Sequence, residues 1–266
     1  MNWGKMKTLF IYLFVALNAV LLTFYIYTVQ KNKTEIVQEK EIIERSMKND
    51  NITVEENATK RDNLGYVNVT ISDLKDIRKE DSGLKYEVEN VDKTSTLKVS
   101  SENAITNVNK GSYRAELDSF LLEKMKLSAN YIFSSYNSSK NEVIFEQQID
   151  SFRVFSNKNA RIVFSVENNG DIKNFTLTSV SNIRKDKNEA LVPSSQAINR
   201  LYHEDLIPKN CRVRTTLGYY TYISQTENQV LIPTWNVEIS DKDGQISNYY
   251  VDAINLNVLN RKGHSP

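Results

Sequence analysis

A run of 22 residues without a charged side chain, Thr8–Val29, constrains this chain more than any other feature. As an α-helix it extends roughly 33 Å, at about 1.5 Å per residue, which is enough to cross the hydrocarbon core of a bilayer. Secretory signal peptides have an apolar region of only about 7–15 residues, followed by small residues at a cleavage site. Here the end of the run and the residues after it are bulky or polar, among them Tyr25 and Gln30. We therefore expect an uncleaved transmembrane helix over residues 8–29.

The orientation of this helix follows from its place in the chain more than from its flanking charges. Lys5 and Lys7 precede it, while Lys31 and Lys33 follow it, so the positive-inside rule gives almost no preference. A short leader before a long polar region favours a cytoplasmic N-terminus. We expect a single-pass protein of the cell membrane with an extracytoplasmic C-terminal region.

Asn18 is a polar residue near the middle of the apolar run, with Ala16 and Ala19 as small neighbours. A side-chain amide at this depth is costly unless another group pairs with it, and small residues let a second helix approach closely. One interpretation is that a single anchor helix simply tolerates one asparagine. The other is a contact through Ala16, Asn18 and Ala19 with a partner helix, which would contribute about 0.6–2 kcal/mol.

Beyond the membrane helix, the composition changes from charged to mixed. Residues 30–62 are highly charged with a thin apolar stripe at helical spacing, and they indicate a juxtamembrane helix and stalk. Alternating apolar and polar residues then indicate strands, and Leu117, Phe120, Leu121 and Met125 fall on one face of a predicted helix.

The expected fold class is α+β, with one N-terminal transmembrane helix followed by two related units of mixed, largely antiparallel sheet packed with helices. The expected parts are a cytoplasmic leader (1–7), the transmembrane helix (8–29), the juxtamembrane helix and stalk (30–62), a first extracytoplasmic unit (63–183), a second extracytoplasmic unit (184–260) and a tail (261–266).

An internal echo in the sequence supports the two related units. ARIVFSVENNGDIKNFTLTSV (160–180) and PTWNVEISDKDGQISNYYVDAI (233–254) each contain an alternating strand, a polar turn with Gly170 or Gly244, and a second strand. Such turns suit hairpins because glycine adopts positive φ without strain. Upstream, NEVIF (141–145) resembles NQVLI (228–232), and helix candidates near 114–126 and 194–204 begin the two copies.

The sequence offers little that could perform catalysis or bind a cofactor. His203, Glu204 and Asp205 are consecutive, so on a helix they point about 100° apart and do not converge on one ion. We assign His203 to a helix C-terminus, where the helix dipole favours it. Cys211 is the single cysteine, and we expect it to pack as a small apolar side chain. We expect no catalytic residue, no cofactor and no metal.

The charge balance argues against nucleic acid as a partner. Lys and Arg total 34 and Asp and Glu total 33, without the basic surplus that phosphate binding requires. The 8 glycines and 4 prolines are too few for glycine-rich phosphate loops or a proline-rich linker.

The two ends of the chain carry a family resemblance. MNW, KTLFI and the long apolar helix, together with LIPTWNVEI and NYYVDAI near the C-terminus, resemble the YycI (WalI) family. These proteins are encoded with the WalK/WalR (YycG/YycF) two-component system of low-GC Gram-positive bacteria. The resemblance implies a protein without enzymatic activity that associates with the sensor histidine kinase WalK and the companion protein YycH, as a heterodimer with the latter. It also implies two mixed α/β units and a role in cell-wall homeostasis.

Two other functions remain open at this point. The C-terminal hairpins also resemble the PepSY-type pattern of exported bacterial proteins, which implies a tethered ligand-binding or protease-inhibiting module. A cell-wall enzyme would need a polar pocket and would lose activity when His203 or Cys211 is replaced.

Overall fold

The computed structural model describes residues 3–55, 61–75, 83–91, 94–127, 130–221 and 227–260. The chain divides into two compact units, Met1–Ile52 and Thr53–Pro266. The expected tail (261–266), with His264, lies outside the described residues.

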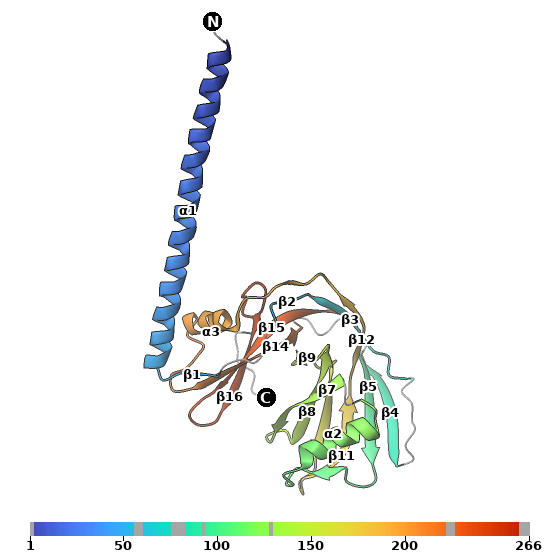
Figure 1. Ribbon diagram of the computed structural model, residues 1–266. Helices are drawn as coiled ribbons and strands as arrows, with labels where there is room; N and C mark the ends of the chain where they lie inside the picture. The colour runs from blue at the N-terminus through green and yellow to red at the C-terminus, as the bar shows by residue number, and fades with distance from the viewer. Residues whose placement is uncertain are drawn as a thin grey trace. The chain divides into compact units, whose positions relative to one another are not determined.

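The first unit consists of one long helix, α1 (Trp3–Asn49), drawn in blue in Figure 1. Its apolar part, Met6–Thr28, is 23 residues long and is the one candidate membrane span within the described ranges. It agrees with the expected segment to within two residues at either end. Glycine and proline are absent from residues 5–49, so the helix continues without a break from the apolar into the charged residues.

The C-terminus of α1 has a clear stop signal. Asn51 takes the left-handed conformation, with φ of 58°. The N–H of Ile52 donates to the carbonyl of Met47 at 2.9 Å. This is the pattern of a Schellman motif with asparagine in place of the usual glycine. The juxtamembrane helix therefore ends at Asn49 and does not extend through the predicted stalk.

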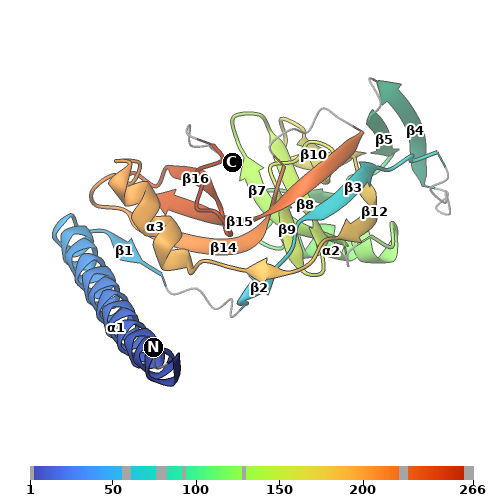
Figure 2. The same cartoon turned by 90° about the horizontal axis from the view of Figure 1, so that it is seen from above.

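The second unit is built around one large sheet, which Figures 1 and 2 show from two directions. Fourteen strands of described residues join in it, with the central order β12-β3-β15-β14-β9-β8-β10-β11-β5-β4; β7 pairs with β8, β16 with β15, β1 with β14 and β6 with β11. The pairings are antiparallel except those of β14 with β1 and with β9. The predicted α+β class with a largely antiparallel sheet is confirmed.

The strands of the large sheet are β1 (Thr53–Val54), β3 (Val67–Ile71), β4 (Leu84–Val91), β5 (Thr94–Ser101), β6 (Thr106–Asn107), β7 (Tyr131–Asn137), β8 (Glu142–Ile149), β9 (Phe152–Phe155), β10 (Arg161–Val166), β11 (Asp171–Leu177), β12 (Val180–Lys185), β14 (Arg212–Tyr220), β15 (Asn228–Ser240) and β16 (Ile246–Asp252). A separate pair joins β2 (Asn63–Leu64) to β13 (Glu189–Ala190).

Helix α2 (Tyr113–Glu123) covers one half of the sheet (Figure 1). Leu117 and Leu121 are completely buried, as the helical spacing predicts. Phe120, on the same face, packs edge-on against Phe175 of β11, with ring centroids 5.8 Å apart. Burying each of these large side chains contributes about 1.5–3 kcal/mol.

Helix α3 (Ser194–His203) packs on the other half of the sheet, beside β15. Its buried residues are Ala197, Ile198 and Leu201. Trp235 of β15 is buried, and its indole N–H donates to the carbonyl of Val192 at 2.9 Å. The tryptophan therefore joins the sheet to the segment that precedes α3.

Both hairpins of the internal echo are present. In β10–β11 and β15–β16 the strands pair antiparallel across their turns. Gly170 and Gly244 take φ values of 89° and 79°, as the turn chemistry predicts.

The segment upstream of the second hairpin differs from the echo. Residues 142–149 and 161–166 are separate strands in the first copy, but NQVLI and PTWNVEI lie on the single strand β15. Pro233 is tolerated there because β15 exchanges one neighbour, β3, for another, β16, at this point. The carbonyl of Pro233 accepts a hydrogen bond from the N–H of Ala253, which follows β16. Because the nitrogen and the carbonyl of one strand residue point to the same side, the missing N–H of Pro233 faces the edge where β3 has ended.

The α2 half and the α3 half of the sheet meet where β9 runs parallel to β14. Gly218 pairs with Arg153 in this register. A Cβ atom on Gly218 would lie 2.6 Å from Cζ of Phe155 and closer still to the carbonyl oxygen of Arg153. The junction therefore requires glycine. The predicted division into two units at residues 183/184 stays a prediction. Strands that precede this point pair with strands that follow it, as β9 does with β14 and β3 with β15.

Candidate functional site

Three polar side chains in the apolar part of α1 form hydrogen bonds with carbonyls of their own helix. The Asn18 amide donates to the carbonyl of Phe14 at 2.8 Å. The hydroxyls of Thr23 and Thr28 donate to carbonyls three or four residues earlier. These bonds reduce the cost of placing the three residues in a membrane. Asn18 can thus be accommodated in a lone helix, while its amide oxygen keeps the capacity to accept from a partner.

Helix geometry separates the three residues predicted to contact a partner helix. At 3.6 residues per turn, Ala16 and Asn18 lie about 160° apart around α1, whereas Ala16 and Ala19 lie about 60° apart. One partner helix cannot therefore meet Ala16 and Asn18 together. A helix–helix contact at Ala16, Asn18 and Ala19 stays a prediction, and it would involve one partner helix at Ala16 and Ala19 and a different partner at Asn18.

The titratable residues singled out in the sequence occupy structural positions. His203 ends α3, and Glu204 forms an ion pair of 2.8 Å with Arg200 of the same helix. Cys211 is buried, which raises the pKa of its thiol. Within the described part of the chain, no group of three or more His, Cys, Asp or Glu residues could hold a metal ion.

A groove of about 590 Å³ lies between β8 and β16, and we call it the β8–β16 groove. It exists because strand side chains alternate between two faces. Val143 and Phe145 of β8 are buried in the core under α2, so their neighbours face the groove. The lining includes Glu142, Ile144 and Glu146 of β8 and Ile246, Asn248 and Tyr250 of β16.

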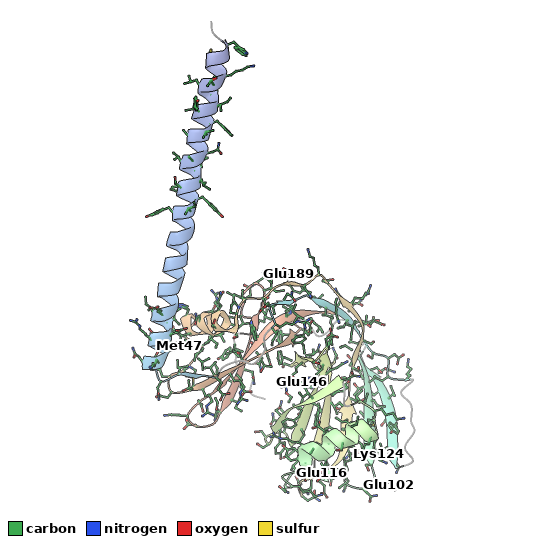
Figure 3. The ribbon with its side chains drawn as sticks, in the orientation of Figure 1. Met47, Glu102, Glu116, Lys124, Glu146 and Glu189 are labelled. Atoms are coloured by element: carbon green, nitrogen blue, oxygen red, sulfur yellow. The ribbon has the colours of Figure 1, made fainter. Side chains whose placement is uncertain are left out.

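A buried carboxylate, Glu146, lines the β8–β16 groove and is labelled in Figure 3. Its oxygens accept from the backbone N–H of Ser156 at 2.7 Å and the hydroxyl of Ser134 at 3.1 Å. Nε of Arg153 lies 3.7 Å away. Burial raises the pKa of Glu146, although the charge of Arg153, the Ser156 and Ser134 hydrogen bonds and the charge of Arg161 oppose this effect.

Two buried polar atoms of the groove lack a hydrogen-bond partner in the described structure. They are Nε of Arg153 and Oδ1 of Asn236, which comes from β15. Arg153 donates through Nη2 to the carbonyl of Phe133 at 3.1 Å. An unpaired buried donor or acceptor costs about 1–3 kcal/mol, so this wall of the groove is built at a cost to stability.

The aromatic residues of the groove stack on one another. Tyr250 lies between Phe155 and Tyr220, with ring centroids 5.7 and 4.6 Å away and nearly parallel planes. Burial, together with the charge of Glu146, raises the pKa of Tyr250. Phe155 and Tyr250 are buried and Tyr220 is half-buried, so the accessible surface of the groove comes from its polar side chains and isoleucines.

The β8–β16 groove was not predicted from the sequence. The signal that could have found it is the alternation of polar and apolar residues in two strands, with Glu142 and Glu146 of β8 on one face, interrupted by Ile144, and Asn236 and Glu238 of β15 on either side of Val237. Each run shows one polar and one apolar face, but nothing local says that the polar faces of two remote strands lie opposite each other. The groove presents positively charged, negatively charged and neutral hydrogen-bonding side chains, a set that suits the binding of a polar ligand.

Comparisons with known proteins give one family and several structural likenesses, of which two follow. The family model of YycI (YycI protein) matches residues 30–254. A search of curated proteins gives no match. An uncharacterized protein from Eubacterium rectale ATCC 33656 is similar with a TM-score of 0.47 and 8% identity, covering 79% of this chain and 90% of its own. The C-terminal domain of YpeB from Bacillus megaterium has a TM-score of 0.44 and 12% identity, covering 86% and 97%.

Proposed function

The chain belongs to the YycI family of regulators of the WalK/WalR system, and on that premise we propose that it is a non-enzymatic, membrane-anchored regulator. In this proposal it associates with the sensor histidine kinase WalK and the companion protein YycH, with which it forms a heterodimer. The association modulates two-component signalling in cell-wall homeostasis. The family match over residues 30–254 carries the proposal.

The candidate span gives the proposal its physical setting. Met6–Thr28 is long and apolar enough to cross a bilayer, and we place the short N-terminus in the cytoplasm and residues 30–266 outside. α1 continues to Asn49, roughly 30 Å beyond the span at about 1.5 Å per residue. A continuous helix of this kind can contact a kinase both within the membrane and next to it.

The regulation requires only a modest free energy. A sensor kinase that exchanges between two signalling states responds to any protein that binds one state more tightly. A difference of about 1.4 kcal/mol changes the ratio of the two states tenfold. A few helix contacts of about 0.6–2 kcal/mol each supply such a difference.

Detergent co-purification from native membranes tests the association. The full chain, tagged at its C-terminus, should retain both the kinase and the companion protein. A matched variant in which residues 8–29 are replaced by an unrelated apolar helix should retain less kinase. If neither protein is retained by the unaltered chain, the proposed association is wrong.

A second candidate function is a tethered PepSY-type module that binds a ligand or inhibits a protease. The β8–β16 groove, with its buried Glu146 and polar lining, favours this candidate. The helix-replacement variant distinguishes the two functions, because a merely tethered module keeps full activity when its anchor is exchanged. Loss of regulation in that variant would exclude the second candidate.

A further inference from the structure

Arg161 is a cation of the β8–β16 groove whose guanidinium has no hydrogen bond or ion pair within the part of the chain that the structure describes. It begins β10, directly across from Glu146 of β8. Arg153 approaches the same carboxylate from β9 at 3.7 Å. Two arginines thus surround one glutamate, which already accepts hydrogen bonds from Ser134 and Ser156.

Among the described residues the groove lining holds three cations and three carboxylates, so the excess of positive charge is local to the surroundings of Glu146. Glu238 faces the groove and forms an ion pair of 3.7 Å with Arg214, which lies outside the lining and also pairs with Glu55 at 2.7 Å. Lys140 and Glu142, near the turn between β7 and β8, carry opposite charges. The accessible charge therefore favours a ligand with an acidic group near Arg161, because guanidinium groups bind carboxylates in a bidentate manner.

The remaining lining indicates what kind of molecule carries that acidic group. Ile144 and the exposed Ile246 offer apolar contacts, and Asn236 offers a side-chain amide whose oxygen has no hydrogen-bond partner among the described residues. A single small anion would leave most of the 590 Å³ unfilled. A saccharide would lack an aromatic surface, since the rings of Phe155 and Tyr250 are buried. Amides and aliphatic groups together match a peptide.

We propose that the β8–β16 groove binds an extended peptide segment with a carboxylate side chain flanked by aliphatic residues. Arg161 and Arg153 hold the carboxylate, Ile144 and Ile246 contact the aliphatic side chains, and Oδ1 of Asn236 accepts a hydrogen bond from a peptide N–H of the ligand. This inference goes beyond the proposed function, because the binding requires neither kinase nor companion protein. Its failure would leave the regulatory role intact.

Fluorescence anisotropy with the full-length chain in detergent micelles tests the proposal. The probes are two end-capped, dye-labelled pentapeptides, Ser-Ile-Glu-Ile-Ser and Ser-Ile-Gln-Ile-Ser, with empty micelles as the blank. The glutamate peptide should bind at least about tenfold more tightly than the glutamine peptide, as expected for a charge-assisted bidentate pair. Equal affinities, or no binding of either peptide, would overturn the proposal.

Variants of the chain locate the binding. Arg161→Gln should abolish the preference for the glutamate peptide, whereas Arg184→Gln, an exposed arginine of β12 outside the groove, should keep it. Ile246→Glu places a negative charge in the groove and should weaken the binding of the glutamate peptide by about tenfold. This variant tests the site independently if Arg161→Gln fails to fold. Unchanged binding in Ile246→Glu would place the ligand elsewhere and overturn the proposal.

Two competitors separate peptide binding from other chemistry. Inorganic phosphate at the concentration of the peptide should not displace it, and neither should maltopentaose. Displacement by phosphate would show a simple anion site, and displacement by the sugar would show a saccharide site. Either result would contradict the proposal.

Discussion

Replacement of Gly218 by alanine tests the junction on which the β8–β16 groove depends. Gly218 of β14 pairs in parallel with Arg153 of β9. An added Cβ would lie 2.6 Å from Cζ of Phe155 and closer still to the carbonyl oxygen of Arg153. Carbon atoms in favourable contact lie about 3.5–4.0 Å apart, so β9 must move by about 1 Å.

The cost of this movement follows from what surrounds it. The carbonyl belongs to the backbone and the ring of Phe155 is buried and stacked, so neither yields easily. Overpacking of this kind costs about 1–3 kcal/mol. For a unit of this size, about 2–4 °C of Tm corresponds to each kcal/mol. We expect Gly218→Ala to lower Tm by about 2–12 °C.

Thermal unfolding of the full-length chain, followed by circular dichroism, measures the effect. The matched control is Gly111→Ala, since a Cβ atom on Gly111 meets nothing within 4 Å and its φ is ordinary. The control should unfold at the temperature of the unaltered chain or slightly above it. Equal Tm values for Gly218→Ala and Gly111→Ala would refute the reasoning on the β9–β14 junction.

Three further predictions concern burial and charge. Leu121→Ala should cost about 2–5 kcal/mol in chemical denaturation because Leu121 is fully buried, while its exposed neighbour Leu122→Ala should stay within about 0.5 kcal/mol; equal costs would disprove the assigned face of α2. Burial raises the pKa of Glu146 in the folded chain, so the folded state favours the protonated carboxyl. As pH rises and Glu146 loses this proton, the folded state becomes less stable relative to the unfolded state. The gain in unfolding free energy from Glu146→Gln should therefore grow from about pH 4 towards neutrality, and a gain that falls would contradict this sign. Cys211 is buried with a raised pKa, so maleimide should label it slowly in the folded chain and rapidly in denaturant, and fast native labelling would show that it is exposed.

Features set by local sequence were predictable. The uncharged run fixed the candidate span, and glycine after Asn or Asp fixed both hairpin turns. The buried face of α2 followed from helical spacing at Leu117 and Leu121. In each case, residues within a few positions of one another determine the outcome, so a pattern in the sequence suffices.

Features set by distant contacts were not predictable. The parallel pairing of β9 with β14 joins residues more than 60 positions apart. The continuity of β15 through Pro233 depends on β3 ending where β16 begins. The groove likewise joins residues of β8 and β16, which lie far apart in the sequence. Alternation marks a polar face, but it does not say which remote strand that face meets.

The autophosphorylation rate of the sensor kinase in membrane vesicles tests the central claim most directly. Vesicles contain the kinase and the companion protein, with and without this chain. A regulator that shifts the kinase between signalling states by about 1.4 kcal/mol should change the rate by up to about tenfold. The variant with residues 8–29 replaced should show a smaller change. An identical rate with and without the unaltered chain would contradict the account.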